Sequence, residues 1–381
     1  MTSKPSTWLM VLLMMFPQVI ETIYSPVLPH IAATFSVAQT TAAQTLSVYF
    51  IAFALGVLCW GILADLIGRR SAMLLGLVTY GVGAGLAIIA PNFEVLLGAR
   101  VVSAFGAAVG SVVAQTMLRD SYDGADLAKL FSIMGAGIAV SPVIGLFSGG
   151  WLATLGGHVL VFGSLLGLAV VLLTLSAIFL PETQVQQAVS EPEVGARLSL
   201  LDIAKTMVVD KRLWLNSALI ALFNIMLFSY YSLAPFAFQR LGFTSVDFGY
   251  SGIVLAVGCF IGSLLNKRLH AKKVAAEQLV FMASVAALAG GCGVWLLQDS
   301  IGFLLPMMLV VISFGIAIPN ILSQALVNYK QVAGTAGALF GLSYYLLLGL
   351  GLALSGWWQH LGSVLCLASA VACCLAYQVR R

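Results

Sequence analysis

Charged residues are scarce in this chain, and their scarcity excludes a water-soluble protein. Only 8% of its 381 residues are Asp, Glu, Lys or Arg, whereas 61% are hydrophobic. Ordinary soluble domains carry about 25% charged residues. Because so few charges cannot cover the surface of a soluble fold of this size, we expect a protein that crosses the membrane many times.

The sequence also lacks the residue patterns of most enzymes and of metal-binding proteins. Its six cysteines all lie inside apolar segments without the spacing of metal ligands, and its four histidines lie near segment ends. It has no glycine-rich phosphate loop, which argues against direct use of ATP. We therefore predict no metal, no cofactor and no catalytic residues. Because the basic residues lie in short loops rather than in one patch, we expect no nucleic-acid partner.

Twelve apolar segments are present, and each approaches the 20 or so residues that a membrane-spanning helix needs. They cover residues 8–29, 42–64, 72–91, 93–118, 130–153, 158–180, 213–237, 246–266, 276–297, 301–326, 333–356 and 360–378. The first lacks a small-residue cleavage site before Pro17, so we expect a retained helix. With a cytoplasmic N-terminus, 16 of the 18 basic residues fall in cytoplasmic positions, which predicts that both termini are cytoplasmic.

The longest polar stretch divides these segments six and six. We predict an N-terminal six-helix bundle at 1–180, a cytoplasmic linker at 181–212 and a C-terminal six-helix bundle at 213–381. Within the linker, the apolar spacing of residues 198–205 favours a short helix at the membrane surface. The expected fold is therefore an all-α polytopic membrane protein.

A faint internal repeat supports this division. Gly61-Ile-Leu-Ala-Asp65 ends the second segment before Arg69, and Gly262-Ser-Leu-Leu-Asn266 ends the eighth before Lys267. Repeats of this kind are common in secondary transporters.

Glu21 is the only acidic residue that lies far from the end of every apolar segment. An ionisable group at that depth costs roughly 2.5–3.5 kcal/mol, so it faces the protein interior or water and indicates a functional site. The alternative is a protonated, hydrogen-bonded structural residue. Arg100 lies at an overlapping depth in the fourth segment, so the two side chains can approach each other. A nearby arginine favours an ionised carboxylate and burial favours a protonated one, as a proton exchanger requires. The alternative for Arg100 is a structural cation.

The run from Gly61 to Ser71 is the most specific pattern in the chain. Gly61 is expected to let a neighbouring helix approach, and Gly68 to permit a tight turn. Asp65 can pair with an arginine or accept backbone N–H groups from a facing helix. With Arg69 and Arg70, this cluster is expected to form a cytoplasmic gate that joins the two bundles in one state and releases them in the other. The alternative is a plain cytoplasmic turn.

This run resembles the signature between helices 2 and 3 of the major facilitator superfamily. Three further stretches resemble its twelve-helix drug:proton antiporters, in particular the bicyclomycin/chloramphenicol-resistance branch. These are Glu21-Thr-Ile-Tyr24-Ser-Pro26-Val-Leu-Pro29, the stretch from Arg100 to Gly110, and Gly137-Ile-Ala-Val-Ser141-Pro142-Val-Ile-Gly145, with Leu146 and Ser141 where glycine is usual. The resemblance implies a proton-coupling role for Arg100. It also implies that the fifth helix, with its antiporter motif, packs against a helix of the second half.

Residues expected to bind substrate are aromatic or carry amide groups, a composition that suits amphiphilic compounds. They are Tyr24, Gln115, Asn224, Phe228, Tyr231, Asn320, Gln324 and Tyr344. For each of them, ordinary helix packing is the alternative.

The function that we expect is proton-coupled export of small amphiphilic compounds, as in multidrug efflux, by alternating access. The protein would not be an enzyme. It would act as a monomer in the bacterial inner membrane, with substrate, protons and lipid as its partners. One alternative is a dedicated proton-driven exporter of a single metabolite, such as a siderophore or metallophore. Another is a membrane-embedded enzyme or lipid-handling scaffold.

Overall fold

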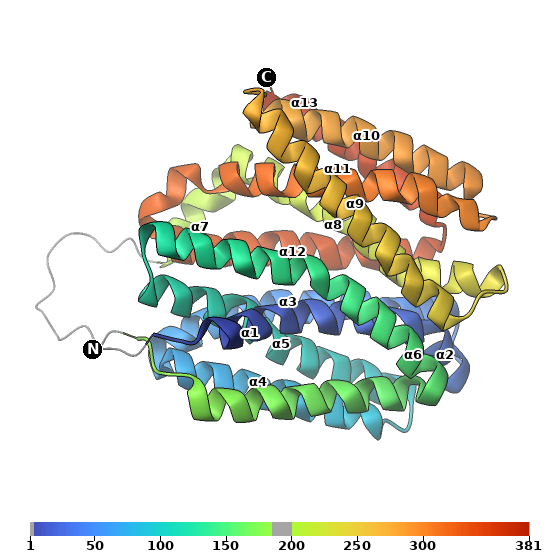
Figure 1. Cartoon of the computed structure of the whole chain (residues 1–381), viewed down its shortest axis with the longest axis horizontal. Helices are drawn as coiled ribbons and strands as arrows, with labels where there is room; N and C mark the ends of the chain where they lie inside the picture. The colour runs from blue at the N-terminus through green and yellow to red at the C-terminus, as the bar shows by residue number, and fades with distance from the viewer. Residues whose placement is uncertain (1–3, 185–199, 381) are drawn as a thin grey trace, which may run out of the picture.

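The protein is described by a computed structural model that covers residues 4–184 and 200–380. Within these ranges the regular secondary structure is entirely helical. Most helices run between two ends of the molecule (Figure 1). We call the end that carries Lys4, Gly68 and Arg380 the terminal end. The opposite end, which carries the loops at 35–38 and 89–92, is the distal end.

Six α-helices and one 3₁₀ turn make up the first half of the chain. They are α1 (Thr7–Ile23), η1 (Ser25–Val27), α2 (Leu28–Thr34), α3 (Gln39–Ile67), α4 (Arg69–Ile88), α5 (Phe93–Ser121) and α6 (Gly124–Phe179). In Figure 1 these blue to green elements occupy the lower part of the molecule.

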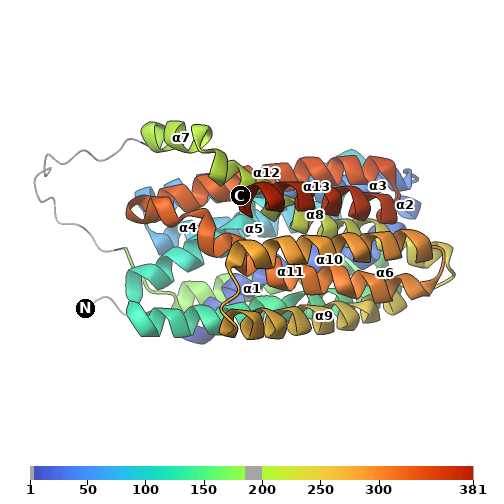
Figure 2. The same ribbon diagram turned by 90° about the horizontal axis from the view of Figure 1, so that it is seen from above.

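The second half begins with a short helix and continues with six long ones. Its elements are α7 (Leu200–Val209), α8 (Lys211–Arg240), α9 (Ser245–Ala271), α10 (Ala276–Leu297), η2 (Ile301–Phe303), α11 (Leu304–Ala325), η3 (Val327–Val332), α12 (Ala333–Trp358) and α13 (Leu361–Arg380). The short α7 lies at the edge of the bundle near the terminal end (Figure 2). It is the helix predicted for the linker, although residues 185–199 lie outside the described ranges.

The chain crosses the bundle twelve times, as predicted. Eleven described runs are long and apolar enough to span a membrane, and one of them, Lys129–Phe179, has 51 residues. At 1.5 Å per residue such a run measures about 77 Å, more than twice the hydrocarbon core, so it has to turn back. It does so at Gly156 and Gly157, whose backbone angles are not helical. Gly157 has a φ of 59°, which a residue without a Cβ adopts at no steric cost.

Local sequence signals fix several helix boundaries. The Asn92 side chain caps α5 by accepting a hydrogen bond from the Val95 amide at 2.9 Å. Thr244 and Asp247 form a capping box at the start of α9. Gly68, with a φ of 95°, separates α3 from α4 and provides the tight turn expected there.

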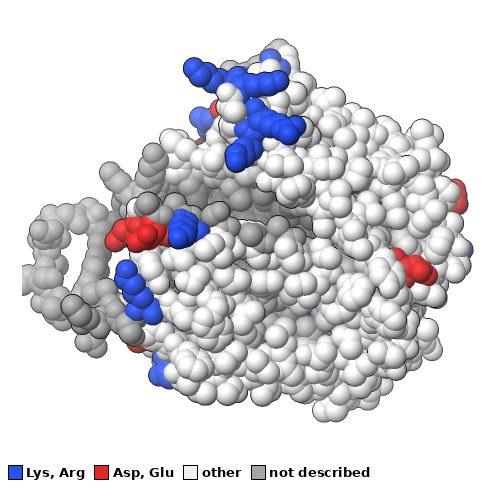
Figure 3. Space-filling model, in the orientation of Figure 1, with Lys and Arg blue, Asp and Glu red and all other residues white. Residues whose placement is uncertain are grey.

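The two halves contact each other mainly along two pairs of helices, α3 with α12 and α6 with α9, and α8 adds smaller contacts with η1, α2 and α3. Three hydrogen bonds that join them lie towards the distal end: Ser25 to the Tyr231 carbonyl, Gln44 to the Ala353 carbonyl, and Ser47 to the Gly349 carbonyl. Figure 3 shows Lys and Arg gathered towards the end where the termini lie, beside a wide uncharged surface. An uncharged surface of this width suits contact with lipid.

Candidate transport cavity

A cavity of about 360 Å³ lies between the two halves. It is lined by α1, α3 and α6 of the first half and by α8, α9, α11 and α12 of the second. Aliphatic and aromatic side chains form most of its wall, and Glu21 is the only charged residue among the described residues that line it. A cavity of this composition can enclose an apolar molecule and presents one carboxyl group to it.

Glu21 reaches the cavity because of its position on α1. Gln18 and Thr22 also line the cavity, and they share one face of the helix with Glu21 through spacings of three and four residues. The Thr22 hydroxyl is satisfied within the helix, since it donates to the Gln18 carbonyl at 2.8 Å. The Glu21 side chain is only 1% exposed, and its Oε1 has no hydrogen-bond partner in the part of the chain that the structure describes. This oxygen is therefore available to a proton or to a ligand.

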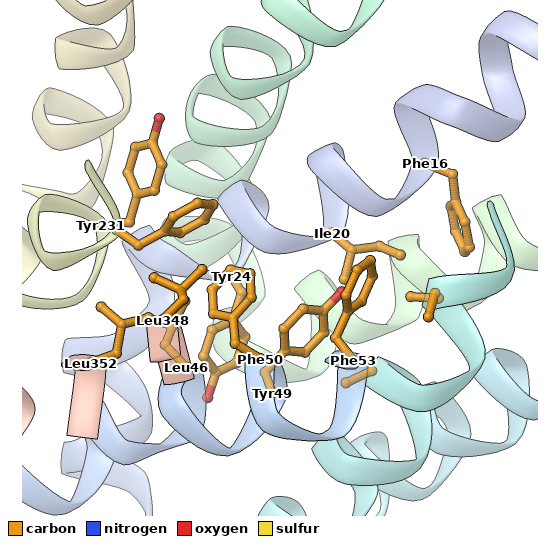
Figure 4. Close-up of a cluster of buried hydrophobic side chains, with 14 of the residues drawn as sticks. Phe16, Ile20, Tyr24, Leu46, Tyr49, Phe50, Phe53, Tyr231, Leu348 and Leu352 are labelled. Carbon is orange, nitrogen blue, oxygen red and sulfur yellow. The ribbon is translucent and has the colours of Figure 1, made fainter. Parts of the chain in front are cut away.

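Arg100 lies next to the cavity wall rather than in it. Its guanidinium carbon is 4.0 Å from the centre of the Tyr24 ring and 4.4 Å from that of Tyr49. The side chain is fully buried, and none of its three nitrogens has a hydrogen-bond partner within residues 4–184 and 200–380. Attraction between the cation and the two ring faces therefore holds the group in place. Figure 4 shows Tyr24 and Tyr49 in the packed cluster between α1 and α3.

Glu21 and Arg100 are thus neighbours without forming an ion pair. No described hydrogen bond or ion pair joins the carboxylate to the guanidinium, which packs on the Tyr24 and Tyr49 rings instead. The overlapping depths expected from the sequence did bring the two charges into one region. The orientation of the side chains, with the aromatic rings against the arginine, was not expected.

The predicted substrate-binding residues divide into two groups. Asn224, Phe228, Tyr231 and Tyr344 line the cavity. Outside its lining lie Tyr24, which packs on Arg100; Gln115; Asn320, which bonds to other polar side chains; and Gln324, which lines a smaller cavity with Asp210.

Sequence reasoning missed several lining residues, of which Gln18 and Phe50 are examples. Gln18 carried a usable signal, because it is a polar residue one turn before Glu21 in an apolar helix. Phe50 carried none, since aromatic residues are common on every face of these helices. Tyr345 contacts Phe50 across the two halves, with ring centres 6.2 Å apart and nearly parallel.

The antiporter motif of the fifth crossing packs against both halves. A Cβ at Gly137 would lie 3.1 Å from Met15, and one at Gly145 would meet Thr22, so these glycines admit α1. Ser141 is buried and donates to the Gly137 carbonyl at 2.9 Å, and Pro142 lines the cavity.

The distal part of the same crossing meets α9. Leu146 stands where glycine is usual in the resembling family. A Cβ at Gly249 would lie 2.8 Å from the Leu146 carbonyl oxygen, and one at Gly252 would lie 3.1 Å from the Leu146 side chain. α6 therefore packs against α1 of the first half on one side and against α9 of the second half on the other.

The predicted cytoplasmic gate forms a cluster within the first half. Arg69 pairs with Asp65 and with Asp120, the latter at 2.9 Å. Glu182 accepts hydrogen bonds from the backbone amides of Arg69 and Arg70. The described hydrogen bonds and ion pairs of this cluster go to the first half and to the start of the linker, where Glu182 and Gln184 lie, so they do not join the two halves in this conformation.

Close helix approach occurs one turn from the place expected for it. A Cβ at Gly61 would meet only the Val112 side chain at an ordinary 3.6 Å, so no close contact depends on this glycine. At Gly56 a Cβ would lie 2.7 Å from the Phe105 carbonyl oxygen and 2.8 Å from Ala108, so α3 and α5 approach closely there.

The sequence matches the Major Facilitator Superfamily over residues 8–374. It is 33% identical to an uncharacterized transporter of Rickettsia bellii (strain RML369-C), over 91% of this chain and 88% of that protein. It is 26% identical to multidrug resistance protein D of Escherichia coli (strain K12), over 87% and 84% of the two chains. Other relatives are named for resistance to chloramphenicol and bicyclomycin, which confirms the resemblance drawn from the motifs.

The fold matches solved structures of the same architecture. A bacterial homolog of the human lysosomal transporter Spinster, in its inward-facing and occupied conformation, superimposes with a TM-score of 0.75 at 16% identity. The match covers 98% of this chain and 96% of the other. At this identity the likeness concerns the fold, and it confirms the predicted fold class of helices arranged in two bundles.

Proposed function

Because the chain belongs to the Major Facilitator Superfamily and is therefore a membrane transporter rather than an enzyme, we propose that it exports small amphiphilic compounds in exchange for protons. The substrate would bind in the cavity between the halves. Glu21 would carry the proton, and the two halves, at 1–180 and 213–381, would rock about that site in a bacterial inner membrane.

The observation that carries this proposal is the position of Glu21. It is the one charged side chain in the described lining of an otherwise apolar and aromatic cavity, and its Oε1 is unpartnered there. A single buried carboxyl group binds a proton less tightly when it also binds a substrate group, and the reverse holds as well. This competition couples proton movement to substrate movement. The relatives named for multidrug resistance support an amphiphilic substrate.

The arrangement of the halves supports alternating access with cytoplasmic termini. Basic residues gather at the terminal end, which is the pattern of a cytoplasmic face. The described hydrogen bonds between the halves lie towards the distal end, while those of the Asp65–Arg69–Asp120 cluster at the terminal end stay within the first half and the start of the linker. We infer that this conformation is closed outside and that formation of a terminal-end contact accompanies the opposite state.

The decisive experiment measures proton release from the purified protein when compounds are added, over a panel of drugs and metabolites. We expect several amphiphilic compounds to release protons. Glu21→Gln should abolish the release while keeping the size of the side chain. Glu94→Gln, which removes an exposed carboxyl at the distal start of α5, is the matched control and should release protons normally.

Two outcomes would contradict the proposal. Proton release that persists in Glu21→Gln would remove the coupling role. A response to one metabolite alone would indicate a dedicated exporter instead of a broad one.

A further inference from the structure

A second cavity, of about 590 Å³, lies at the terminal end and shares no residue with the central one. It is formed where α8 and α10 begin and α13 ends. Its lining consists of Lys211, Arg212, Leu215, Ala275, Glu277, Gln278, Gln378, Val379 and Arg380. α13 packs against both α8 and α10, so three helices of the second half meet here.

The charge of this cavity is positive. Three of its residues are basic and one is acidic. Arg212 is partly neutralised by Glu277, with 3.4 Å between Nη2 and Oε1. Lys211 and Arg380 form no ion pair among the described residues, and the Arg380 guanidinium lies 5.7 Å from the Phe281 ring, which limits its freedom. Two cations therefore remain available to an anion.

Backbone donors add to this charge at only one of the two helix starts. The first turn of α8 is capped by Asp210, which accepts from the Arg212 and Leu213 amides. The first turn of α10 follows Ala275, whose side chain provides no cap. The N–H groups of this turn therefore lie at the positive end of the helix dipole without a capping side chain, and the Glu277 carboxylate of the same turn is paired with Arg212.

The surroundings of the cavity suit a lipid. Leu215 and Val379 give it an apolar wall, and Trp214 and Tyr377 beside them are 41% and 45% exposed. Aromatic residues with exposed rings near the ends of spanning helices are typical of the level of the lipid headgroups. A free anion would gain nothing from this apolar and aromatic rim, whereas a phospholipid would place its acyl chains along it.

We propose that this cavity binds a phosphate group, and that the phosphate is the headgroup of an anionic phospholipid from the cytoplasmic leaflet. The two unpaired cations would contact its oxygens, and the start of α10 would donate N–H groups to it. A lipid bound there would hold the ends of α8, α10 and α13 together, at a distance from the transport cavity. The choice of leaflet rests on the orientation proposed above.

The test is native mass spectrometry of the full chain in detergent, titrated separately with phosphatidylglycerol and with phosphatidylcholine. We expect the chain to retain one phosphatidylglycerol in preference to phosphatidylcholine. The double variant Lys211→Gln/Arg380→Gln should lose about twenty-five-fold in affinity for it, since each basic residue near a membrane surface contributes about a factor of five. The control variant Lys129→Gln/Lys272→Gln removes two exposed charges of the same end outside the cavity and should bind normally.

A separate titration with inorganic phosphate distinguishes free phosphate from a lipid headgroup as the ligand. If phosphate alone stabilises the wild-type chain against heating and the double variant does not respond, the cavity binds free phosphate and the lipid assignment is wrong. Equal retention of the two lipids, or equal losses in the test and control variants, would show that the basic residues act only as a diffuse surface charge, and the site would be rejected.

Discussion

At the terminal end, two clusters occupy equivalent places in the two halves and differ in charge. In the first half, Arg69 joins Asp65 of α3 to Asp120 of α5 through ion pairs. In the second half, Asn320 of α11 donates to Asn266 of α9 at 2.7 Å and bonds to the His270 ring at 2.8 Å. Asp65 and Arg69 are four residues apart, as are Asn266 and His270.

The difference extends into the core of the protein. Glu21 and Arg100, the two buried ionisable groups with formal charge among the described residues, both belong to the first half. The buried polar side chains described between 200 and 380 are uncharged. The two halves thus share a framework of helices but not their electrostatics. Under the proposed exchange of substrate for protons, the coupling groups would therefore belong to the first half, and the second half would supply a neutral wall.

The largest expected effect comes from moving the carboxyl group across the cavity. Glu21→Gln should reduce gradient-driven transport to background, and adding Asn224→Asp should not restore it. Asn224 lines the same cavity from the second half, whose described buried polar side chains are uncharged, and its amide donates to the Ile220 carbonyl at 2.8 Å. Transport by the single and the double variant is measured in proteoliposomes with an imposed pH gradient. Recovery in the double variant would show that either half can carry the proton.

The next effect concerns Arg100. Arg100→Met keeps the length of the side chain but loses its attraction to the Tyr24 and Tyr49 rings, worth about 2 kcal/mol when desolvated, so transport should fall more than about tenfold. Arg100→Lys keeps a charge without the flat guanidinium, so its transport rate should lie between those of the wild type and Arg100→Met. Initial efflux rates, normalised to folded protein, distinguish these cases. Full activity of Arg100→Met would reduce the residue to a packing role.

A smaller effect is expected at the charged cluster. The Asp65 side chain is 69% exposed, so its pair with Arg69 is worth less than about 0.5 kcal/mol. The Asp120 side chain is 24% exposed and should contribute about 1 kcal/mol. Asp120→Asn should therefore lower the melting temperature by about 1–2 °C, and Asp65→Asn by less. The reverse order of the two variants in a thermal melt would contradict this ranking.

If Asp65 has a role in gating, it should appear in conformation rather than in stability. Crosslinking between cysteines introduced at the terminal ends of the two halves should change in Asp65→Asn. An unchanged pattern together with normal transport would make this loop a plain cytoplasmic turn.

The smallest effect is expected at the neutral cluster. His270→Gln keeps a side chain that can bond to Asn320, so transport should stay within about twofold of wild type between mildly acidic and neutral pH. A pH profile of transport that differs between this variant and the wild type would show that the second half also responds to protons.

The sequence by itself determined the number of crossings, the gathering of basic residues at one end, and the enclosure of Glu21 in the protein interior. Each follows from the cost of placing polar or charged groups in hydrocarbon, which depends on position along the chain and needs no tertiary contact. The tight turn at Gly68 was also predictable, because it depends on the backbone of one residue.

The tertiary structure decided which face of each helix meets the cavity. These helices are apolar on nearly every side, so the sequence contains little information about their rotation. For this reason Tyr24 turned out to pack on Arg100 while Glu21, three residues earlier, lines the cavity. Asn320 likewise bonds to Asn266 and His270 rather than facing a substrate. Such choices depend on how neighbouring side chains fill space between helices, and only the folded arrangement contains that information.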